Sequence, residues 1–591
     1  MNEAASSEPV EGSILNRGLE PRRLLFAVLV LVAGGSAALA AVGFRELIEA
    51  LSYLFHNAWS GPDAALPAWQ VVLVPAIGGF FIGLFIFHVM PGRRPQGVAD
   101  VIEACALKGG RMSLREGIGA AVISAASIGC GASVGREGPA VHIGASLASS
   151  LTARFGLTRS QLRTLLGCGV AAAVAASFNA PIAGVFFALE VVIGHYALQV
   201  FVPTVFASVA GTIVSRLYFG DDPAFLLPDV QIVSFFEMPI FAALGIVAAA
   251  AAIAFMRLTP VIESAVDRTG LPKWIRPAIG GALVGLIALA YPEVLGVGYE
   301  ATDSALKGQY GIAMLAGLLF AKLVATSICF GFGFGGGVFS PSLFLGAMAG
   351  GVFGRLMASP LGDLHSGVGA YSIVGMGAAA AVVLGAPIST ILMVLELTGD
   401  YRLTLAVMLA VVVATAISRP IAGISFFIGQ LRRRGVMVSG GHDMAAIEAI
   451  RIDSILRHDQ IEISGTATLD EVRTAMISAP ENELFIVDDD GCLIGTLGFS
   501  DLGDVAFNRD RDPGRVAADL ARRSAPILLA EDALERAVEY FSDDDEGLLP
   551  VVDDRESRRP IGCVHERDVM RAYTRALAEV RAEEHGESTG R

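Results

Sequence analysis

The stretch Gly135-Arg136-Glu137-Gly138-Pro139 places a charged pair between helix-breaking residues in the middle of an apolar sequence. Proline suits the first turn of a helix, and glycines leave backbone N–H groups uncovered. A helix beginning at Pro139 would direct its unsatisfied amides and the positive end of its dipole toward Glu137, or toward an anion in its place. The stretch therefore predicts an anion site with a built-in competitor.

The composition indicates a polytopic membrane protein with a separate soluble domain. Of 591 residues, 53% are hydrophobic and only 17% are charged, and the mean hydropathy is +0.60. No soluble globular domain needs that much apolar surface, so we expect most of the chain to lie in lipid. Residues 441–591 carry 34 acidic and 17 basic side chains, whereas the remainder has a net charge of +2. The acidic part is therefore predicted to be a soluble domain.

The cysteines and the first residues of the chain indicate no special chemistry. The six cysteines contain no CxxC pair, and we expect none of them to have a histidine partner. Neither a disulfide framework nor a metal site is therefore expected. Residues 1–21 are polar and acidic and lack the order of a signal peptide, which predicts a cytoplasmic N-terminal tail. The cysteines are Cys105, Cys130, Cys168, Cys329, Cys492 and Cys563.

Apolar runs fill residues 22–434, and full spans alternate with half spans. The first run begins after Arg23 and extends toward Leu54, which is long enough for one tilted span. Many later runs are broken by glycine, proline or a charge. Broken helices are tolerated at membrane depth only where they line a protected cavity. The positive-inside rule predicts a cytoplasmic position for Arg22, Arg23, Arg93, Arg94 and Arg432–Arg434.

Two motifs occur twice, which predicts an internal duplication. The first, Gly135-x-x-x-Pro139-x-x-x-x-Gly144-Ala145, returns as Gly337-x-x-x-Pro341-x-x-x-x-Gly346-Ala347. The second, Ala180-Pro181-Ile182 followed by Leu189-Glu190, returns as Ala386-Pro387-Ile388 followed by Leu395-Glu396. The prolines of the two motifs are 42 residues apart in one copy and 46 in the other. We expect repeats at about 22–220 and 235–434, with a site between them.

Three motifs resemble, in family order, the signatures of the CLC chloride channels and chloride/proton antiporters. They are the Gly135–Pro139 stretch, Phe178-Asn179-Ala180-Pro181 and Gly337-Val338-Phe339-Ser340-Pro341. The resemblance covers about residues 22–434. It implies an all-α polytopic fold with an inverted repeat of tilted and broken helices, a pore in each subunit of a homodimer, and transport of chloride or other small inorganic anions. It also implies a multi-pass protein of a bacterial-type plasma membrane with both termini in the cytoplasm.

Carried over residue by residue, the resemblance makes Glu137 the external gate. Its carboxylate would occupy the anion path when ionised and leave it when protonated or displaced, because carboxylate and anion compete for the same amide-lined positive potential. The alternative is an ion pair of Glu137 with Arg136, which is disfavoured because adjacent residues on a helix do not face each other. The anion-binding positions implied are Gln96, Gly97, Arg136, Gly138, Val338, Phe339 and Phe427.

Two of these positions depart from the family pattern. Gln96, in the segment Pro95-Gln96-Gly97-Val98-Ala99, stands where the family usually has a serine. Its amide can donate to an anion but also brings a carbonyl acceptor, so the alternative is that Gln96 turns away and only backbone amides bind. Phe427 stands where the family has the tyrosine that closes the inner side of the pore. Its ring could constrict the pore but cannot hydrogen-bond the ion.

Val191 occupies the position of the internal proton-relay glutamate of many antiporters of the family. Valine at this position favours a gated chloride channel, and the alternative is a chloride/proton antiporter that uses a water path or another acid. The preceding Glu190 and its repeat mate Glu396 are expected to cap or bond neighbouring backbone. We do not expect an enzyme, because an intramembrane metalloprotease would need the His-Glu-x-x-His motif, which is absent from the sequence.

After residue 434 the pattern changes to short apolar runs that occur twice. The segment 484–489 followed by Gly495 returns as 549–554 followed by Gly562, each after an amphipathic helix. This β-α-β-β-α repeat resembles a pair of α/β CBS domains, expected at 450–508 and 514–576, between a linker at 435–449 and an acidic tail at 577–591.

The CBS resemblance implies an adenine nucleotide, with Asp501 and Asp568 on the ribose. Both runs that carry these aspartates lack the hydroxyl that would lie near phosphate, so the alternative is a module that only stabilises the dimer. Nucleic acid is not an expected partner, because this module has a net negative charge and lacks a basic patch. No cofactor is expected to be required beyond chloride as a bound ligand.

Overall fold

The computed structural model contains two compact units, Met1–Val438 and Ser439–Arg591. The boundary between them falls inside the linker predicted at 435–449. The predicted N-terminal tail and most of that linker lie outside the described residues. The structure describes residues 21–57, 67–152, 154–220, 232–436, 450–503, 514–543 and 547–585.

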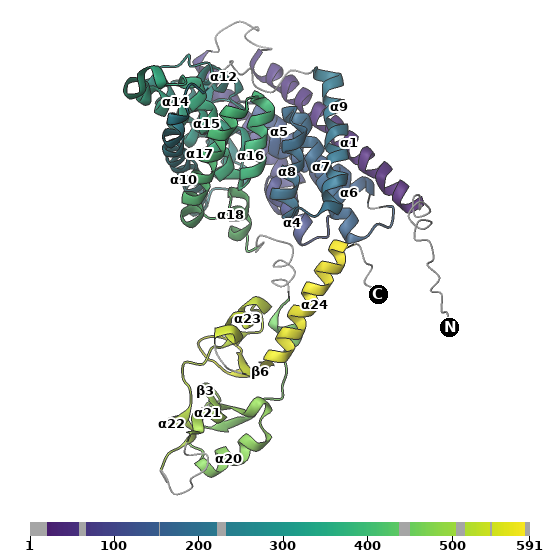
Figure 1. Ribbon diagram of the computed structural model, residues 1–591, viewed down its shortest axis with the longest axis vertical. Helices are drawn as coiled ribbons and strands as arrows, with labels where there is room; N and C mark the ends of the chain where they lie inside the picture. The colour runs from purple at the N-terminus through teal and green to yellow at the C-terminus, as the bar shows by residue number, and fades with distance from the viewer. Residues whose placement is uncertain are drawn as a thin grey trace, which may run out of the picture. The chain divides into compact units, whose positions relative to one another are not determined.

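The first unit is built from long and short apolar helices (Figure 1). Eight helices of the described residues are long and apolar enough to cross a membrane, and four shorter apolar segments lie among them. This confirms the expected mixture of full and half spans. The helices of the first half are α1 (Pro21–Ser52), α3 (Ala68–Val89), α4 (Val98–Ala106), α5 (Leu114–Gly129), α6 (Glu137–Thr152), α7 (Arg159–Phe178), α8 (Pro181–Phe187) with a π-helical turn (Ala188–Ile193), and α9 (Leu198–Phe219).

The second half repeats this order of helices up to α17, as the duplicated motifs predict. Its helices are α10 (Met238–Arg268), α11 (Arg276–Ala288), α12 (Tyr299–Leu306), α13 (Ile312–Gly331), α14 (Phe339–Leu361), α15 (Val368–Leu384), α16 (Pro387–Thr398), α17 (Tyr401–Ala422) and α18 (Phe426–Arg433).

Equivalent helices of the two halves make equivalent contacts. Helix α1 packs on α9 as α10 packs on α17, and α6 packs on α7 as α14 packs on α15. Across the halves, α3 packs against α11 and α8 against α16. Figure 1 shows α8 and α16 within the same helical layer. The two repeats therefore form a single body with a shared interior.

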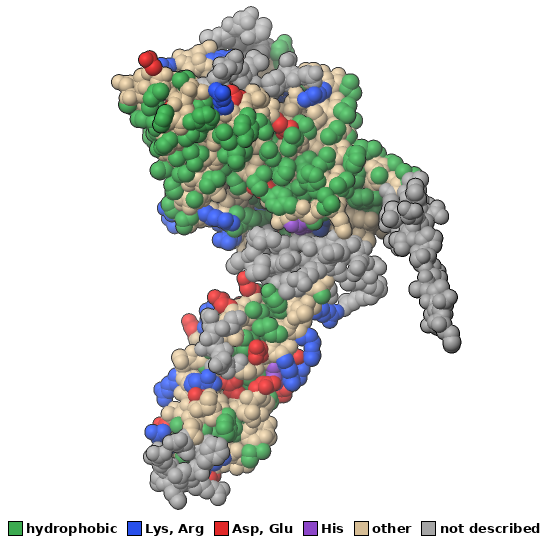
Figure 2. Space-filling view, viewed as in Figure 1, with side chains coloured by type: hydrophobic (Ala, Val, Ile, Leu, Met, Phe, Trp, Pro, Cys, Tyr) green, Lys and Arg blue, Asp and Glu red, His purple; other side chains and the backbone are tan. Residues whose placement is uncertain are grey.

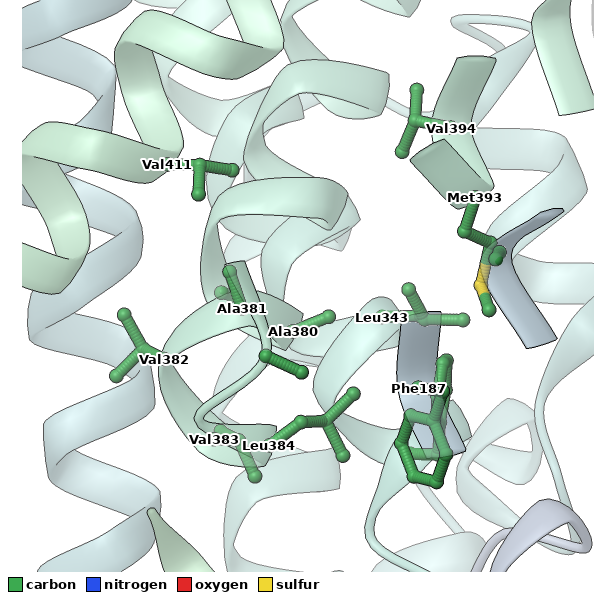
Figure 3. Packing of buried hydrophobic residues seen from close by; sticks show 14 of the residues in the cluster. Phe187, Leu343, Ala380, Ala381, Val382, Val383, Leu384, Met393, Val394 and Val411 are labelled. Atoms are coloured by element: carbon green, nitrogen blue, oxygen red, sulfur yellow. The ribbon is translucent and has the colours of Figure 1, made fainter. Parts of the chain in front are cut away.

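That interior is one apolar core to which both halves contribute. Phe187 of α8, Leu343 of α14 and Met393 of α16 approach one another in Figure 3 and belong to the same buried cluster. Hydrophobic side chains also cover much of the side of this unit that Figure 2 shows. The exposed apolar residues of the unit include Phe206 at 60% exposure and Val412 at 61%. Such a surface is stable only in lipid, so the unit is an integral membrane protein.

Paired glycines let the helices cross closely, at the same place in each repeat. A Cβ on Gly144 would lie 2.8 Å from the carbonyl oxygen of Gly169, where α6 crosses α7. A Cβ on Gly346 would lie 2.3 Å from the carbonyl oxygen of Gly375, where α14 crosses α15. Membrane helices associate largely through this kind of close backbone packing, because lipid supplies no hydrophobic drive between them.

The second unit contains two small sheets of equal topology. In each sheet the first two strands are parallel and the last two antiparallel. This agrees with the predicted repeat. Its strands and main helices are β1 (Glu462–Ser464), α20 (Leu469–Ser478), β2 (Glu483–Val487), β3 (Leu493–Gly498), α21 (Phe499–Leu502), α22 (Ala517–Leu520), β4 (Leu528–Leu529), α23 (Leu534–Asp543), β5 (Leu548–Val552), β6 (Pro560–His565) and α24 (Glu566–His585). Helix α24 extends to His585, so the predicted tail at 577–591 begins as helix.

We predict that Gly346→Ala destabilises the membrane unit. The new methyl group would press on Gly375, forcing α14 and α15 apart at a cost of about 1–3 kcal/mol in the free energy of unfolding. The thermal unfolding midpoint of the purified protein in detergent measures this. Gly35→Ala on α1 is the control, because its Cβ meets no atom within 4 Å. Equal midpoints for the two variants would contradict the packing argument.

Candidate functional site

The two repeats are joined backbone to backbone immediately before two helices. The N–H of Gly135 donates to the carbonyl of Gly337 at 2.7 Å, and the N–H of Gly337 donates to the carbonyl of Gly135 at 2.7 Å. Helix α6 begins two residues after the first glycine, and α14 begins two residues after the second. A Cβ on Gly138 would lie only 2.9 Å from the Cα of Gly337. The beginnings of α6 and α14 therefore meet inside the unit, as the duplicated motif predicts.

Glu137 is the first residue of α6 and is buried at this junction, with 1% of its surface exposed. One carboxylate oxygen accepts a hydrogen bond from the hydroxyl of Tyr299 at the start of α12. The other accepts from the hydroxyl of Ser340, on the first turn of α14, at 2.5 Å. The carboxylate is thus held by donors from the second repeat. Helix α6 begins two residues earlier than the predicted start at Pro139.

Arg136 does pair with Glu137, contrary to the sequence argument. Its Nε lies 3.8 Å from the nearer carboxylate oxygen of Glu137. Helical spacing does not apply to this pair, because α6 begins at Glu137 and Arg136 lies outside the helix. The Arg136 side chain can therefore turn toward the carboxylate of Glu137. Its guanidinium also lies over the ring of Tyr299, with 4.7 Å between the Cζ atom and the ring centroid.

Two of the residues around Glu137 were missed as contacts of its side chain. Ser340 lies within the quoted motif, but the resemblance assigned only backbone amides there. Tyr299 lies in no repeated motif, and it follows Gly298, whose φ of +87° turns the chain just before α12. A single tyrosine after a glycine is no signal in the sequence, so only the tertiary structure could find it.

A cavity of about 520 Å³ reaches the junction from one side; we call it the arginine cavity. It brings together five of the predicted positions, namely Gln96, Gly97, Gly138, Val338 and Phe427. Six basic side chains and two acidic ones line it, which gives the cavity an excess of positive charge. The basic residues are Arg93, Arg94, Lys273, Arg276, Arg433 and Arg434, and the acidic residues are Glu263 and Asp267.

The side chain of Gln96 is already engaged. Its amide nitrogen donates to a carboxylate oxygen of Glu116 on α5 at 2.9 Å. The amide carries two N–H groups, so one remains for the cavity that Gln96 lines. Phe427 is buried beside Phe426, and their rings meet edge to face.

Phe339 does not line the arginine cavity. Its ring packs on those of Phe178 and Phe187, with ring centroids 4.8 and 6.0 Å apart. Its side chain is therefore part of the packing behind the junction. Val191, on the π-helical turn after α8, is partly buried against the same core.

A second cavity, of about 450 Å³, includes Tyr299 in its lining; we call it the tyrosine cavity. Tyr299 and Tyr310 line it, together with Glu293 and Glu300. None of the predicted site residues is among its lining residues. Tyr299 therefore connects this cavity to Glu137 through the hydroxyl hydrogen bond.

Glu190 and Glu396 bond backbone across the repeats, which confirms the structural role predicted for them. Glu396 accepts from the N–H groups of Ile182 and Ala183 at the start of α8, both at 2.8 Å. Glu190 accepts from the N–H groups of Ile388 and Ser389 at the start of α16, at 3.1 and 2.8 Å. Each carboxylate satisfies helix-starting amides of the other repeat.

In the second unit, both predicted ribose ligands are held by arginines. Asp501 lies 2.8 Å from the Nε of Arg522 and accepts from the N–H of Gly498 at 2.8 Å. Asp568 lies 2.6 Å from the Nε of Arg457. A cavity of about 610 Å³ includes Asp568 in its lining.

The expectation that no cysteine has a histidine partner is wrong for Cys563. His565 follows it by two residues on strand β6, so their side chains leave the same face. Both contact one carboxylate oxygen of Asp459. The CxxC spacing does not reveal this pair, because residues two apart share a face only on a strand.

The first unit has the features of one class of protein. The unit is a multi-pass helical body with duplicated halves. The beginnings of two helices meet inside it, and an arginine-rich cavity reaches that point. These features are typical of membrane proteins that move small anions. Comparison with known proteins gives the family. The chain matches the family described as voltage gated chloride channel over residues 78–419, more than half its length, and therefore belongs to the CLC family. Residues 516–575 match the CBS domain. The chain is thus a CLC-type chloride transport protein with a C-terminal CBS region.

Individual relatives cover most of the membrane unit. A putative chloride channel protein ClcB-like of Ralstonia nicotianae is 34% identical over 64% of this chain and 90% of its own. A voltage-gated ClC-type chloride channel ClcB of Escherichia coli is 32% identical over 67% and 96%. Among solved structures, a slow cyanobacterial Cl⁻/H⁺ antiporter covers 71% of this chain and 99% of its own at a TM-score of 0.64 and 22% identity, and a eukaryotic CLC transporter covers 93% and 99% at 0.62 and 18%. These structures share the fold.

We predict that Glu396→Ala destabilises the membrane unit, because the amides of Ile182 and Ala183 lose their acceptor. An unsatisfied buried donor costs about 1–3 kcal/mol. The shift in thermal unfolding midpoint in detergent measures the loss. Glu46→Ala, at an exposed glutamate of α1, is the matched control and should leave the midpoint unchanged. An unchanged midpoint for Glu396→Ala would mean that these two hydrogen bonds contribute nothing.

Proposed function

We propose that the chain is a gated chloride channel in which Glu137 is the gating carboxylate. The observation that carries the proposal is that Glu137 is linked to one cavity through its hydrogen-bond partner and to another through the next residue of the chain. Tyr299, whose hydroxyl donates to Glu137, lines the tyrosine cavity, and Gly138, the next residue, lines the arginine cavity. The Glu137 side chain in this position would close the path between the cavities. When the side chain moves away, the path would open.

The contacts of Glu137 suit a seat that an anion can take over. Hydroxyl groups of Tyr299 and Ser340 donate to the carboxylate, and the guanidinium of Arg136 lies close by. The beginnings of α6 and α14 add the positive ends of two helix dipoles. Each of these groups is a donor or a positive charge, so each would stabilise chloride in place of the carboxylate. Protonation of Glu137 would weaken its hold on the same groups.

The arginine cavity supplies the approach from the other side. Its basic excess would raise the local concentration of chloride next to Gly138 and Val338. We propose that the backbone N–H groups there, with the free N–H of the Gln96 amide, contact the ion. Phe427 would narrow the route without hydrogen-bonding the ion.

Channel and antiporter are the two candidates for the transport mode. Val191 cannot carry a proton, and the bacterial relatives are named chloride channels, which supports the channel. The structural neighbours include Cl⁻/H⁺ antiporters, so the second candidate is an antiporter that moves protons by another route.

Three further parts of the proposal rest on the family resemblance. The protein would be a homodimer, and its termini would lie in the cytoplasm. An adenine nucleotide would bind the second unit at the cavity that contains Asp568, where Arg457, Arg571 and Arg575 supply positive charge for phosphates. The ribose-binding role of Asp501 stays a prediction.

We predict that Glu137→Gln makes chloride flux nearly independent of pH. The glutamine amide cannot ionise, so at every pH it would bind the surrounding donors only weakly. Efflux from proteoliposomes at a series of pH values measures this. Glu46→Gln at the exposed surface is the control and should keep the pH dependence of the wild type. Unchanged pH dependence in Glu137→Gln would refute the gate.

Tyr299→Phe gives an independent arm of the same test. It removes one donor from the carboxylate, and a hydrogen bond to a charged group contributes about 1.5–3 kcal/mol. We expect a corresponding shift of about 10- to 100-fold toward the open gate at fixed pH. Tyr310→Phe, which changes the other tyrosine of the same cavity, should have little effect.

The reversal potential under a proton gradient separates the two transport modes. When the chloride gradient is held constant, the current through a channel should reverse at the chloride Nernst potential, whatever the pH difference across the membrane. An antiporter should shift its reversal potential when only the proton gradient changes. Planar bilayer recordings of the purified protein measure this directly, and such a shift would replace the channel with the antiporter.

A further inference from the structure

The second unit gathers three metal-ligating side chains at one point. The Sγ of Cys563, an imidazole nitrogen of His565 and a carboxylate oxygen of Asp459 lie within 4.8 Å of one another. The Sγ lies 3.2 Å and the Nε2 lies 3.1 Å from the same Oδ1 of Asp459. The three residues come from strand β6 and from the segment before β1, so the two halves of the unit meet here.

We propose that Asp459, Cys563 and His565 form a binding site for a divalent transition metal of the Zn²⁺ class. The set of one sulfur, one imidazole nitrogen and one carboxylate oxygen is the donor chemistry that Zn²⁺ prefers, and Mg²⁺ or Ca²⁺ would instead require oxygen atoms.

Two of the three separations between the ligand atoms can be compared with tetrahedral zinc, and the third, between the sulfur and the imidazole nitrogen, is at most 4.8 Å. Tetrahedral zinc with bonds of about 2.3 Å to sulfur and about 2.0–2.2 Å to nitrogen and oxygen holds its ligand atoms about 3.4–3.6 Å apart. The observed separations of 3.2 and 3.1 Å are a few tenths of an ångström shorter. An ion could therefore enter with a small outward movement of Asp459, whose side chain is 43% exposed.

The surroundings of His565 supply an independent argument. The imidazole is 1% exposed, and its second nitrogen, Nδ1, lies 3.5 Å from a carboxylate oxygen of Glu481. Metal-binding histidines commonly direct the second nitrogen to a carboxylate, which fixes the tautomer and makes the ligating nitrogen a better donor. Within the described residues the Nδ1 atom makes no hydrogen bond, and the carboxylate of Glu481 is its ion-pair partner.

The charge balance of the site also permits a cation. Asp459 and Glu481 are acidic, and metal binding would release the thiol proton of Cys563 and leave a thiolate. Arg457 lies 3.8 Å from the other carboxylate oxygen, Oδ2, of Asp459, which leaves Oδ1 directed at Cys563 and His565. The exposed side of Asp459 leaves room for a water molecule as a fourth ligand.

Cobalt(II) is the probe that tests the proposal, because cobalt bound to a thiolate gives a charge-transfer absorption band. The full-length protein in detergent, freed of metal with a chelator, is titrated with Co²⁺. We expect the band to saturate at one equivalent per chain and to disappear on addition of Zn²⁺ but not of excess Mg²⁺. Absence of the band, or its loss to Mg²⁺, would overturn the proposal.

Variants identify the ligands. Cys563→Ser should abolish the band, and Asp459→Asn, at an exposed position that tolerates substitution, should weaken Co²⁺ binding at least 10-fold. Glu481→Gln should weaken it by about 10-fold, as expected for a carboxylate that supports a ligating histidine. Cys492→Ser and His458→Ala are matched controls, because both residues lie in the same unit outside the cluster. A band that survives Cys563→Ser, or that Cys492→Ser removes, would contradict the assignment.

Discussion

Two positive helix ends meet within the membrane unit, and this contact constrains the rest of its structure. The paired backbone hydrogen bonds of Gly135 and Gly337 hold the beginnings of α6 and α14 together. Each beginning carries uncovered amides and about half a positive charge, so the two ends repel in surroundings that screen poorly. A negative charge between them removes the repulsion. The carboxyl group of Glu137 is buried at this junction, so the anion exchange that we propose would take place where the two repeats are held together.

The remaining links between the repeats follow the same rule. Water cannot reach helix-starting amides inside a bilayer, so each must find an acceptor within the protein. Glu190 and Glu396 satisfy this need reciprocally, each at the short helix of the other repeat. The short helices α8 and α16 are therefore held at their beginnings as well as by packing. Because the chain is duplicated, a glutamate at the same position of each repeat can accept from the amides of the equivalent short helix in the other repeat.

The sequence predicted the parts of this arrangement that are local and repeated. The meeting of α6 and α14 and the bonding roles of Glu190 and Glu396 follow from motifs that occur twice. The ion pair of Arg136 with Glu137 was not expected, because both residues were treated as parts of one helix. Helix α6 begins at Glu137, so Arg136 lies outside it and helical spacing does not apply to the pair. The contacts of Tyr299 with Glu137 and of Glu116 with Gln96 join segments without shared motifs. Such contacts depend on tertiary packing, which periodicity does not report.

The second unit places chemistry at the seam between two copies as well. Strand alternation puts Cys563 and His565 on one face of β6, a signal that was present in the sequence, whereas Asp459 and Glu481 come from the other half of the unit. In the membrane unit that seam holds a carboxylate among donors. In the second unit it holds a thiol and an imidazole around carboxylates, and the anion and the cation that we propose for the two units follow from this difference in donor chemistry.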